Sequence, residues 1–268
     1  MIVAVDTGGT KTLVAVFDTD GQIVAEERFP TPHDISGYIT ELCSTIDRLT
    51  KDIEITCISV GLPGTIQDGV MVWAGNLEWA DIDIASLLKP HYACPVVVEN
   101  DANLAGLAET RALSETPPIC LYMTISTGIG TGVILDGRID PLLSRVEGGR
   151  IMLEHGEGYE IWELFASGKA ILGRYGKLAS EIDDEATWRE IAANLAQGML
   201  ALLPFLKPDV VVIGGGVGVH FDRFVPFVNE QMTANLRDDY RPRLVKAAHP
   251  DEAVLYGCYY HALDVLAA

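Results

Sequence analysis

Two glycine-rich segments hold the residues of this sequence whose types and spacing best suit chemistry. The first is Asp6-Thr7-Gly8-Gly9-Thr10-Lys11, and the second is Ser126 to Gly132. Because glycine allows positive φ angles and close approach of the main chain, the amides of such turns can bind phosphate oxygens. Thr10 and Lys11 add a hydroxyl and a positive charge, and Asp6 can hold magnesium directly or through water. These residue types suit the transfer of a phosphoryl group.

The first turn also has a simpler interpretation. A hairpin uses glycine for its geometry, and an aspartate beside it bonds to nearby main chain. The second turn favours the ligand-binding interpretation, because it offers a further set of phosphate donors: Thr127, Gly128, Gly130 and Gly132. Neither turn matches GxxxxGK[ST] or a GxGxxG before a helix, so P-loop and Rossmann sites are disfavoured.

A third segment, Glu99-Asn100-Asp101-Ala102-Asn103, follows an apolar run and is expected to begin a helix. Asn100 or Asp101 can simply cap that helix, which is a common role for both residue types. A carboxylate at the carboxyl end of a strand in an α/β sheet also lies where ligands usually bind. Both roles therefore stay open for Asp101 at this point.

Alternating short apolar runs and helical periodicity predict the elements that position these segments. The pattern of strand, glycine turn and strand occurs twice, more than a hundred residues apart, which indicates a duplicated architecture with a cleft between its halves. The expected strands are 2–5, 13–17, one after Gly21, 54–60, 93–99, 119–125, 133–135 and 209–213. The expected helices are 35–49, one from about 100, 188–206, one from about 219, and 253–266.

Length and composition favour two domains. The 268 residues are nearly half apolar, and Pro117-Pro118 is the best candidate junction. We therefore expect an N-terminal α/β domain over 1–116 and a C-terminal α/β domain over 117–268, with the last helix packing back on the first domain. The formal net charge of -19 repels nucleic acid phosphates and disfavours a nucleic acid partner.

The five cysteines are scattered and show neither a metal-ligand spacing nor a disulfide framework: Cys43, Cys57, Cys94, Cys120 and Cys258. A reduced, cytoplasmic location fits this usage. The chain starts directly on a strand-like run and has no long apolar stretch, so neither secretion nor membrane anchoring is expected.

Four segments of the sequence, taken together, resemble the ROK family of sugar kinases and sugar-responsive repressors. They are Asp6 to Lys11, Glu99 to Asn103, Ser126 to Gly132 and Gly214 to Gly216. The resemblance covers nearly the whole chain. It implies the actin-like ATPase, or ribonuclease H-like, fold, with ATP and a sugar bound in an interdomain cleft. It also implies ATP and Mg2+ as cofactors, and a homodimer would fit it.

The resemblance assigns a role to each candidate residue. Around the transferring phosphate it places Asp6, Gly8, Gly9, Thr10 and Lys11, and around the other phosphates it places Thr127, Gly128, Gly130 and Gly132. The adenosine pocket would be lined by Gly214, Gly215 and Gly216. The catalytic base would be Asp101, and the sugar would be bound by Gly64, Asn76, Asn100, Asp101, Glu147, Arg150 and Glu163.

The chain departs from the family pattern where the family commonly has Glu-x-Gly-His and a cysteine-rich zinc loop. Here Glu147-Gly148-Gly149-Arg150 ends in arginine, and no cysteine lies between Cys120 and Cys258. We therefore expect no structural zinc, and we expect His155 to be a surface residue rather than a zinc ligand. Arg150 either pairs with a carboxylate or donates to the sugar. Ser126 replaces a usual glycine, which is a mild change.

The function expected from this resemblance is ATP-dependent phosphorylation of a hexose or hexose derivative at its C6 hydroxyl, in carbohydrate metabolism. The identity of the sugar stays open, as does polyphosphate as the donor. A sugar-binding regulator of the same family is one alternative, although the first phosphate strand begins at residue 2, where a regulator carries a helix-turn-helix. A sugar-independent actin-like ATPase is the other alternative.

Overall fold

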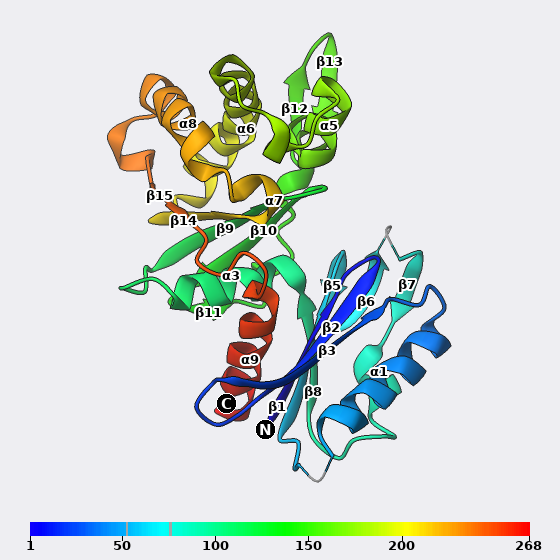
Figure 1. Ribbon diagram of the computed structural model, residues 1–268. Coiled ribbons are helices and arrows are strands. Elements are labelled where there is room, and N and C mark those ends of the chain that lie inside the picture. Colours follow the sequence, from blue (N-terminus) through cyan, green and yellow to red (C-terminus); the bar gives the residue numbers. More distant parts are fainter. Residues whose placement is uncertain (52, 75–76) are drawn as a thin grey trace. The chain divides into compact units, whose positions relative to one another are not determined.

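The computed structural model describes residues 1–51, 53–74 and 77–268, which form two compact units (Figure 1). The first unit comprises Met1–Ala108, Pro141–Arg145 and Asp251–Ala268. The second unit comprises Glu109–Asp140 and Val146–Pro250. The C-terminal helix therefore belongs to the same unit as the N-terminal strands. A domain boundary after residue 116 stays a prediction.

The first unit is built on a mixed sheet whose described strands have the order β3-β2-β1-β4-β8. The first three strands pair antiparallel: β1 (Ile2–Thr7), β2 (Lys11–Phe17) and β3 (Ile23–Pro30). The sheet continues in parallel through β4 (Cys57–Leu62) and β8 (Val96–Asn100). Val and Ile dominate the central strands, and such β-branched residues favour extended backbone. The carboxyl ends of β1, β4 and β8 thus lie at one edge of the sheet.

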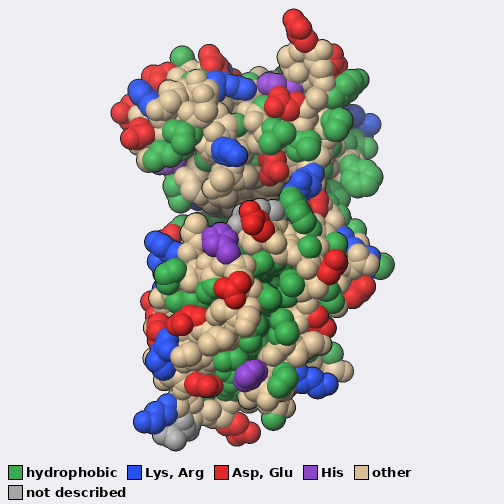
Figure 2. Space-filling view, turned by 90° about the vertical axis from the view of Figure 1, so that its right-hand side faces the viewer, with side chains coloured by type: hydrophobic (Ala, Val, Ile, Leu, Met, Phe, Trp, Pro, Cys, Tyr) green, Lys and Arg blue, Asp and Glu red, His purple; other side chains and the backbone are tan. Residues whose placement is uncertain are grey.

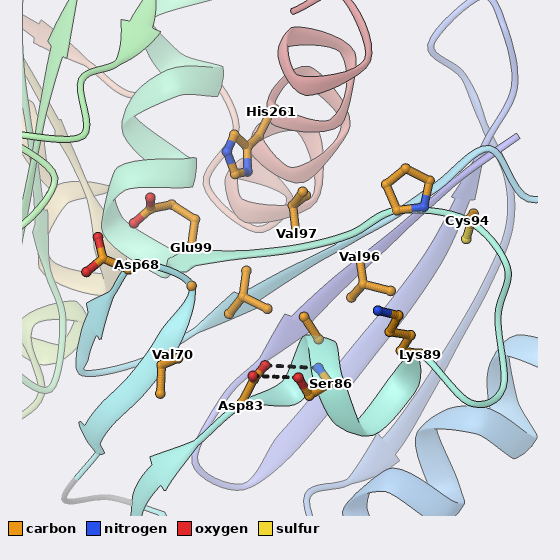
Figure 3. Close-up of a pocket in the computed structure, with 14 residues that line it drawn as sticks. Asp68, Val70, Asp83, Ser86, Lys89, Cys94, Val96, Val97, Glu99 and His261 are labelled. Carbon is orange, nitrogen blue, oxygen red and sulfur yellow. Dashed lines mark hydrogen bonds between the residues drawn. The ribbon is translucent and has the colours of Figure 1, made fainter.

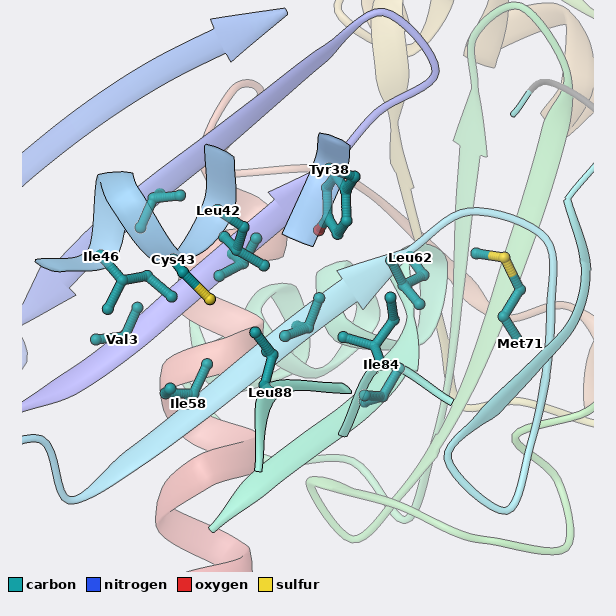
Figure 4. Packing of buried hydrophobic residues seen from close by; sticks show 14 of the residues in the cluster. Val3, Tyr38, Leu42, Cys43, Ile46, Ile58, Leu62, Met71, Ile84 and Leu88 are labelled. Atoms are coloured by element: carbon teal, nitrogen blue, oxygen red, sulfur yellow. The ribbon is translucent and has the colours of Figure 1, made fainter. Parts of the chain in front are cut away.

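Helices cover both faces of this sheet. Helix α1 (Ile35–Leu49) buries Tyr38, Leu42 and Ile46 against the face that carries Val3 and Ile58 (Figure 4). Helix α9 (Ala253–Leu266) packs on β1 and β4 from the opposite face. A side chain at Gly61 would lie 2.7 Å from Val254 Cγ1, so α9 needs glycine there for its close approach.

The second unit repeats the same strand order, β11-β10-β9-β14-β15. Its antiparallel strands are β9 (Ile119–Ile125), β10 (Ile129–Leu135) and β11 (Arg138–Ile139), and its parallel strands are β14 (Val210–Gly214) and β15 (Arg243–Lys246). Helices α6 (Glu185–Leu206) and α8 (Phe221–Asn235) pack on each other, with Trp188 stacked on Phe224. The repeated order shows that the chain contains two copies of one α/β architecture.

Further short strands and helices lie outside these two sheets. In the first unit they are β5 (Thr65–Gln67), β6 (Val70–Ala74), β7 (Trp79–Ile82) and α2 (Ile84–Leu88). In the second they are β12 (Met152–His155), β13 (Gly158–Ile161), α4 (Trp162–Ala166), α5 (Gly168–Tyr175) and α7 (Gly215–Gly218). Helix α3 (Asp101–Arg111) begins in the first unit and ends in the second.

The surface mixes charged and apolar side chains. On the face shown in Figure 2, Asp and Glu side chains are interspersed with Lys, Arg and hydrophobic ones. Within residues 1–51, 53–74 and 77–268, no helix is both long and apolar enough to cross a bilayer.

Candidate active site

The first glycine turn joins β1 to β2 at the carboxyl end of β1. The Gly8 amide donates to the Lys11 carbonyl over 2.9 Å, and a Cβ at Gly8 would lie 3.0 Å from that same oxygen. The sequence led us to expect positive φ angles at Gly8 and Gly9, but neither glycine has one. Other candidate glycines, Gly64 and Gly215, do have positive φ angles. Thr10 and Lys11 are exposed, so both side chains can reach a ligand at the turn.

A buried threonine pair holds this turn in place. The Thr31 hydroxyl donates to the Gly8 carbonyl over 2.8 Å and lies 2.9 Å from the Thr12 hydroxyl. The Thr31 amide donates to the Thr10 carbonyl over 3.0 Å. Both threonine side chains are buried, so the turn keeps its shape without a ligand. Sequence reasoning missed Thr31, because a contact across 23 residues leaves no local signal.

Asp6 lies just before the turn in a partly desolvated position. Burial raises the pKa of Asp6 to about 6, and the positive charge of Arg28 opposes that rise. The neighbouring Thr7 hydroxyl bonds the buried Tyr38 hydroxyl over 2.7 Å and fixes the end of the strand. A cation beside Asp6 would favour the charged carboxylate, so the residue suits a magnesium ligand.

Asn100, at the end of β8, caps helix α3. Its Oδ1 accepts from the amides of Ala102 and Asn103, at 2.8 and 3.1 Å. Its Nδ2 donates to the Gly64 carbonyl over 2.8 Å, so the structure brings two of the candidate residues together. Gly64 has a φ of +87°, and a Cβ there would lie 2.3 Å from the Trp73 carbonyl oxygen. Asn76, a further candidate, lies outside the described residues.

Asp101 is the first residue of α3 and is half-buried. Its Oδ1 lies 2.8 Å from the Ala102 amide, but Asn100 bonds both this amide and the next free one. The cap that α3 needs is therefore provided by Asn100. Sheet register pairs Asp6 with Gly61 and Gly61 with Glu99, two residues before Asp101. Asp6 and Glu99 are thus about 10 Å apart across two strand spacings, at the same edge of the sheet.

Glu99 and Asn103 tie α3 to its surroundings. Glu99 Oε1 accepts from the Asn103 side chain and the Asn100 amide, at 2.9 and 2.7 Å. Burial raises the pKa of Glu99, and these two hydrogen bonds oppose the rise. Asn103 also donates to the Ser144 carbonyl over 2.7 Å. This network fixes the backbone that presents Asp101.

The second glycine turn is shorter than the sequence predicted. It covers Ser126 to Gly128, where the Ser126 amide donates to the Gly128 carbonyl over 2.9 Å. Gly130 and Gly132 lie within β10 and pair with Thr124 and Tyr122 of β9. The expectation that these two glycines belong to the turn is wrong, because the ladder between β9 and β10 begins at Ile129. Thr127 is exposed at the tip of the turn.

Glu163 lies against this second turn. Its Oε2 accepts from the Ile129 amide over 3.3 Å, and a Cβ at Gly128 would lie 2.7 Å from it. The Gly168 amide, at the start of α5, donates to the Ser126 carbonyl over 2.7 Å. The turn, Glu163 and the start of α5 therefore form one bonded group.

The segment from Glu147 to Arg150 packs closely against β10. A Cβ at Gly149 would lie 1.8 Å from the Ile129 carbonyl oxygen, and the Gly148 amide donates to the Thr131 hydroxyl over 2.8 Å. Glu147 is exposed as a whole residue, yet desolvation of its carboxyl raises the pKa of Glu147. The Arg150 charge lowers this pKa and the Glu163 charge raises it, so the three side chains share one electrostatic environment.

The sequence predicted that His155 is a surface residue rather than a zinc ligand. It is half-buried in β12, and its ring stacks on Phe165 with centroids 3.9 Å apart and planes at 6°. Within the described parts of the chain, no three His, Cys, Asp or Glu side chains are grouped as a metal site. Packing against Phe165 thus gives His155 a structural role.

The glycine triplet begins at the last residue of β14 and continues into α7. Gly214 and Gly215 pack closely on β9, since a Cβ at either would lie 2.6 Å from Tyr122 Oη or from Thr124 Oγ1. Gly216 is exposed and faces open space. Beside the triplet lies a cavity of about 240 Å³, lined by Ile213, Gly214, Gly215, Gly218, Val219, Lys246, Ala247 and Pro250. Its size and apolar walls fit part of a nucleoside, and of its lining residues the sequence predicted Gly214 and Gly215.

A larger cavity, of about 590 Å³, lies along β8 in the first unit (Figure 3). Asp68 and Glu99 lie at one end and Lys89 and Cys94 at the other. The buried His261 Nδ1 has no hydrogen-bond partner among the described residues, whereas some other polar groups of the cavity bond within the protein. Asp83, for example, accepts from the amide and hydroxyl of Ser86, at 2.9 and 2.6 Å. Among the candidate segments that the structure describes, Glu99 to Asn103 reaches this cavity, through Glu99.

Comparisons with known proteins concern the whole chain and its fold. The sequence profile described as the ROK family matches residues 2–265. A fructokinase of Zymomonas mobilis is 29% identical over 88% of this chain and 85% of its own. The ROK hexokinase of Thermus thermophilus superposes with a TM-score of 0.80 at 27% identity, covering 100% of this chain and 99% of the other.

A ROK family glucokinase of Streptomyces griseus, solved in complex with glucose and AMPPNP, also superposes with a TM-score of 0.80. It is 23% identical and covers 98% of this chain and 99% of its own, so the likeness concerns the fold. The mixed α/β architecture is that of the actin-like ATPases. With a profile match over nearly its whole length, this chain belongs to the ROK family.

Proposed function

We propose that this protein phosphorylates a hexose or hexose derivative at the C6 hydroxyl, with ATP as the donor and Asp101 as the general base. The observation that carries the proposal is that the helix cap and the proposed base are two different residues at the start of α3. Asn100 provides the helix cap, and a half-buried Asp101 stands beside it at the carboxyl edge of the sheet. The similarity to a fructokinase and to hexokinase and glucokinase structures supports the same reaction.

In the proposed reaction the Asp101 carboxylate accepts the proton of the sugar hydroxyl. The hydroxyl oxygen bonds to the γ-phosphorus as the bond to the β,γ-bridging oxygen breaks, and ADP leaves. Asp6 is suited to hold magnesium, which would neutralise charge on the phosphates. Lys11 and the amides of the two glycine turns would bind the phosphate oxygens through donors that are already in place.

The sugar hydroxyls would be recognised by side chains that accept and donate hydrogen bonds in fixed directions. We assign this role to Glu147 and Glu163, which share one electrostatic environment, and to Asn76 and Gly64. Asn100 has its oxygen engaged by α3 and one N–H of Nδ2 engaged by the Gly64 carbonyl, so it would donate to the sugar through the second N–H of Nδ2. The cavity beside Gly214 and Gly215 would take the adenosine.

A coupled ADP-release assay over a panel of sugars tests the proposal. We expect sugar-dependent ADP release, with fructose, glucose and mannose among the first sugars to try. ATP turnover that is equal with and without sugar would favour an actin-like ATPase. Sugar binding without turnover by either ATP or polyphosphate would favour a regulator.

Arg150 is expected to support Glu147 rather than to choose the sugar. Arg150 lowers the pKa of Glu147, and an exposed pair of this kind contributes at most about 1 kcal/mol. Arg150→His should therefore lower Tm by roughly 1–4 °C and leave the ranking of kcat/KM across sugars unchanged. Thermal unfolding and the sugar panel measure the two effects. A reordered ranking at unchanged Tm would show instead that the guanidinium donates to the sugar.

The protein is expected to fold without zinc. The segment around His155 is held by stacking on Phe165 and by the β12–β13 pairing, which need no metal. Extended treatment with a strong zinc chelator should leave the circular dichroism spectrum and Tm unchanged. One zinc per chain by elemental analysis, with loss of structure on its removal, would contradict this expectation.

A further inference from the structure

We infer that Glu109 is a positioning residue for the nucleotide, holding the loop that forms one wall of the cavity beside Gly214 and Gly215. The inference rests on the proposed use of that cavity for adenosine. Glu109 lies near the end of α3 and is 2% exposed. No sequence motif pointed to it.

Both oxygens of this buried carboxylate accept from the loop after β15. Oε2 accepts from the Ala248 amide over 2.6 Å, and Oε1 accepts from the His249 amide over 2.7 Å. The His249 ring nitrogen Nδ1 lies 3.4 Å from Oε1. A buried carboxylate is costly without such partners, so the pairing fixes the loop and the side chain together.

The two residues that Glu109 holds stand between two residues that line the cavity. Ala247 and Pro250 belong to its wall, as does Lys246 at the end of β15. The Ala247 amide continues the strand pairing by donating to the Ile213 carbonyl over 2.9 Å. Beyond Ala247, the next two amides of the wall, those of Ala248 and His249, are bonded to the Glu109 carboxylate.

Helix stability does not explain a glutamate at this position. A negative charge in the last turns of a helix is unfavourable, because the carboxyl end of the helix is itself negative. Glu109 lies two residues before Arg111, the last residue of α3. Its two loop amides compensate for that placement, which ties the residue to the loop rather than to the helix.

The test compares nucleotide binding in Glu109→Gln with that in Asp209→Asn. A glutamine keeps one acceptor oxygen but turns an NH2 group toward a backbone N–H, so one of the two bonds is lost. We expect Kd for ADP, by calorimetry without sugar, to rise at least tenfold, and KM for ATP to rise likewise with KM for the sugar within twofold. Asp209 also accepts a backbone amide in the same sheet, from Ile119 over 2.9 Å, but at the opposite end of β14.

Asp209→Asn should therefore leave Kd for ADP within twofold, even where it lowers Tm. An equal loss of ADP affinity in both variants, or none in folded Glu109→Gln, would overturn the inference. If Glu109→Gln does not fold, hydrogen exchange of the native protein decides. The Ala248 and His249 amides should exchange slowly although Ala248 is exposed, and fast exchange would overturn the inference. Failure of the native protein to bind ADP at all would instead count against the proposed function.

Discussion

Asp101→Asn is expected to lower kcat by about two to four orders of magnitude, the range for loss of a general base. An amide keeps the size and the hydrogen-bonding oxygen of the side chain but cannot take the proton of a sugar hydroxyl. Because Asn100 caps α3, folding should be unaffected. Steady-state kinetics with the best sugar of the panel, together with thermal unfolding, measure both quantities. Sugar affinity, measured by calorimetry, should change much less than kcat.

Two variants serve as controls for this result. Asp20→Asn removes an exposed carboxylate from a turn of the same unit and should leave kcat unchanged. Asn100→Ala removes the cap and should cost roughly 1 kcal/mol of stability. Near-native turnover by Asp101→Asn would mean that another group takes the proton and that Asp101 serves the helix.

Asp6→Asn is expected to abolish most activity while it stabilises the free protein. The pKa of Asp6 is raised by burial from 3.8 to about 6, so the folded state disfavours the ionised carboxylate. This cost is absent below about pH 3.8, where folded and unfolded chains both hold the proton, and it is complete above about pH 6. The asparagine variant should therefore gain on the order of 2 kcal/mol above pH 6.

The activity of Asp6→Asn should fall about 100-fold or more, because the proposed reaction uses this carboxylate to hold magnesium at the phosphates. Urea unfolding at pH 8 and at pH 5, with no nucleotide or divalent cation, measures the gain in stability. The gain should shrink at pH 5. A destabilised variant at pH 8, or a difference that does not depend on pH, would contradict the account of Asp6.

Elements with a strong periodic signal could be predicted closely from the sequence. The bounds of α1, β9 and α9 agree with the expected 35–49, 119–125 and 253–266. Helix α1 also has a clear start, since the Asp34 side chain accepts from the Gly37 amide over 2.7 Å. The small sheets, β5–β7 and β12–β13, could not be predicted, because strands of three to five residues with exposed positions carry too little pattern.

The candidate site shows the same division between local and distant information. Local motifs predicted Asp6, Asp101 and the first turn, since glycines and acids cluster there in sequence. The threonine at 31 and the glutamate at 109 were missed, because each acts on a segment far along the chain. Gly130 and Gly132 were misplaced, since a glycine inside a strand looks the same in sequence as a glycine inside a turn.

The most direct test of the central claim is to identify the product of the reaction. The purified protein would be incubated with MgATP and each sugar of the panel, and the products would be analysed by mass spectrometry and 31P NMR. We predict ADP and a sugar 6-phosphate in equal amounts for at least one hexose, and neither above background with Asp101→Asn. Release of ADP and inorganic phosphate with no phosphorylated sugar would contradict the claim that this protein is a sugar kinase.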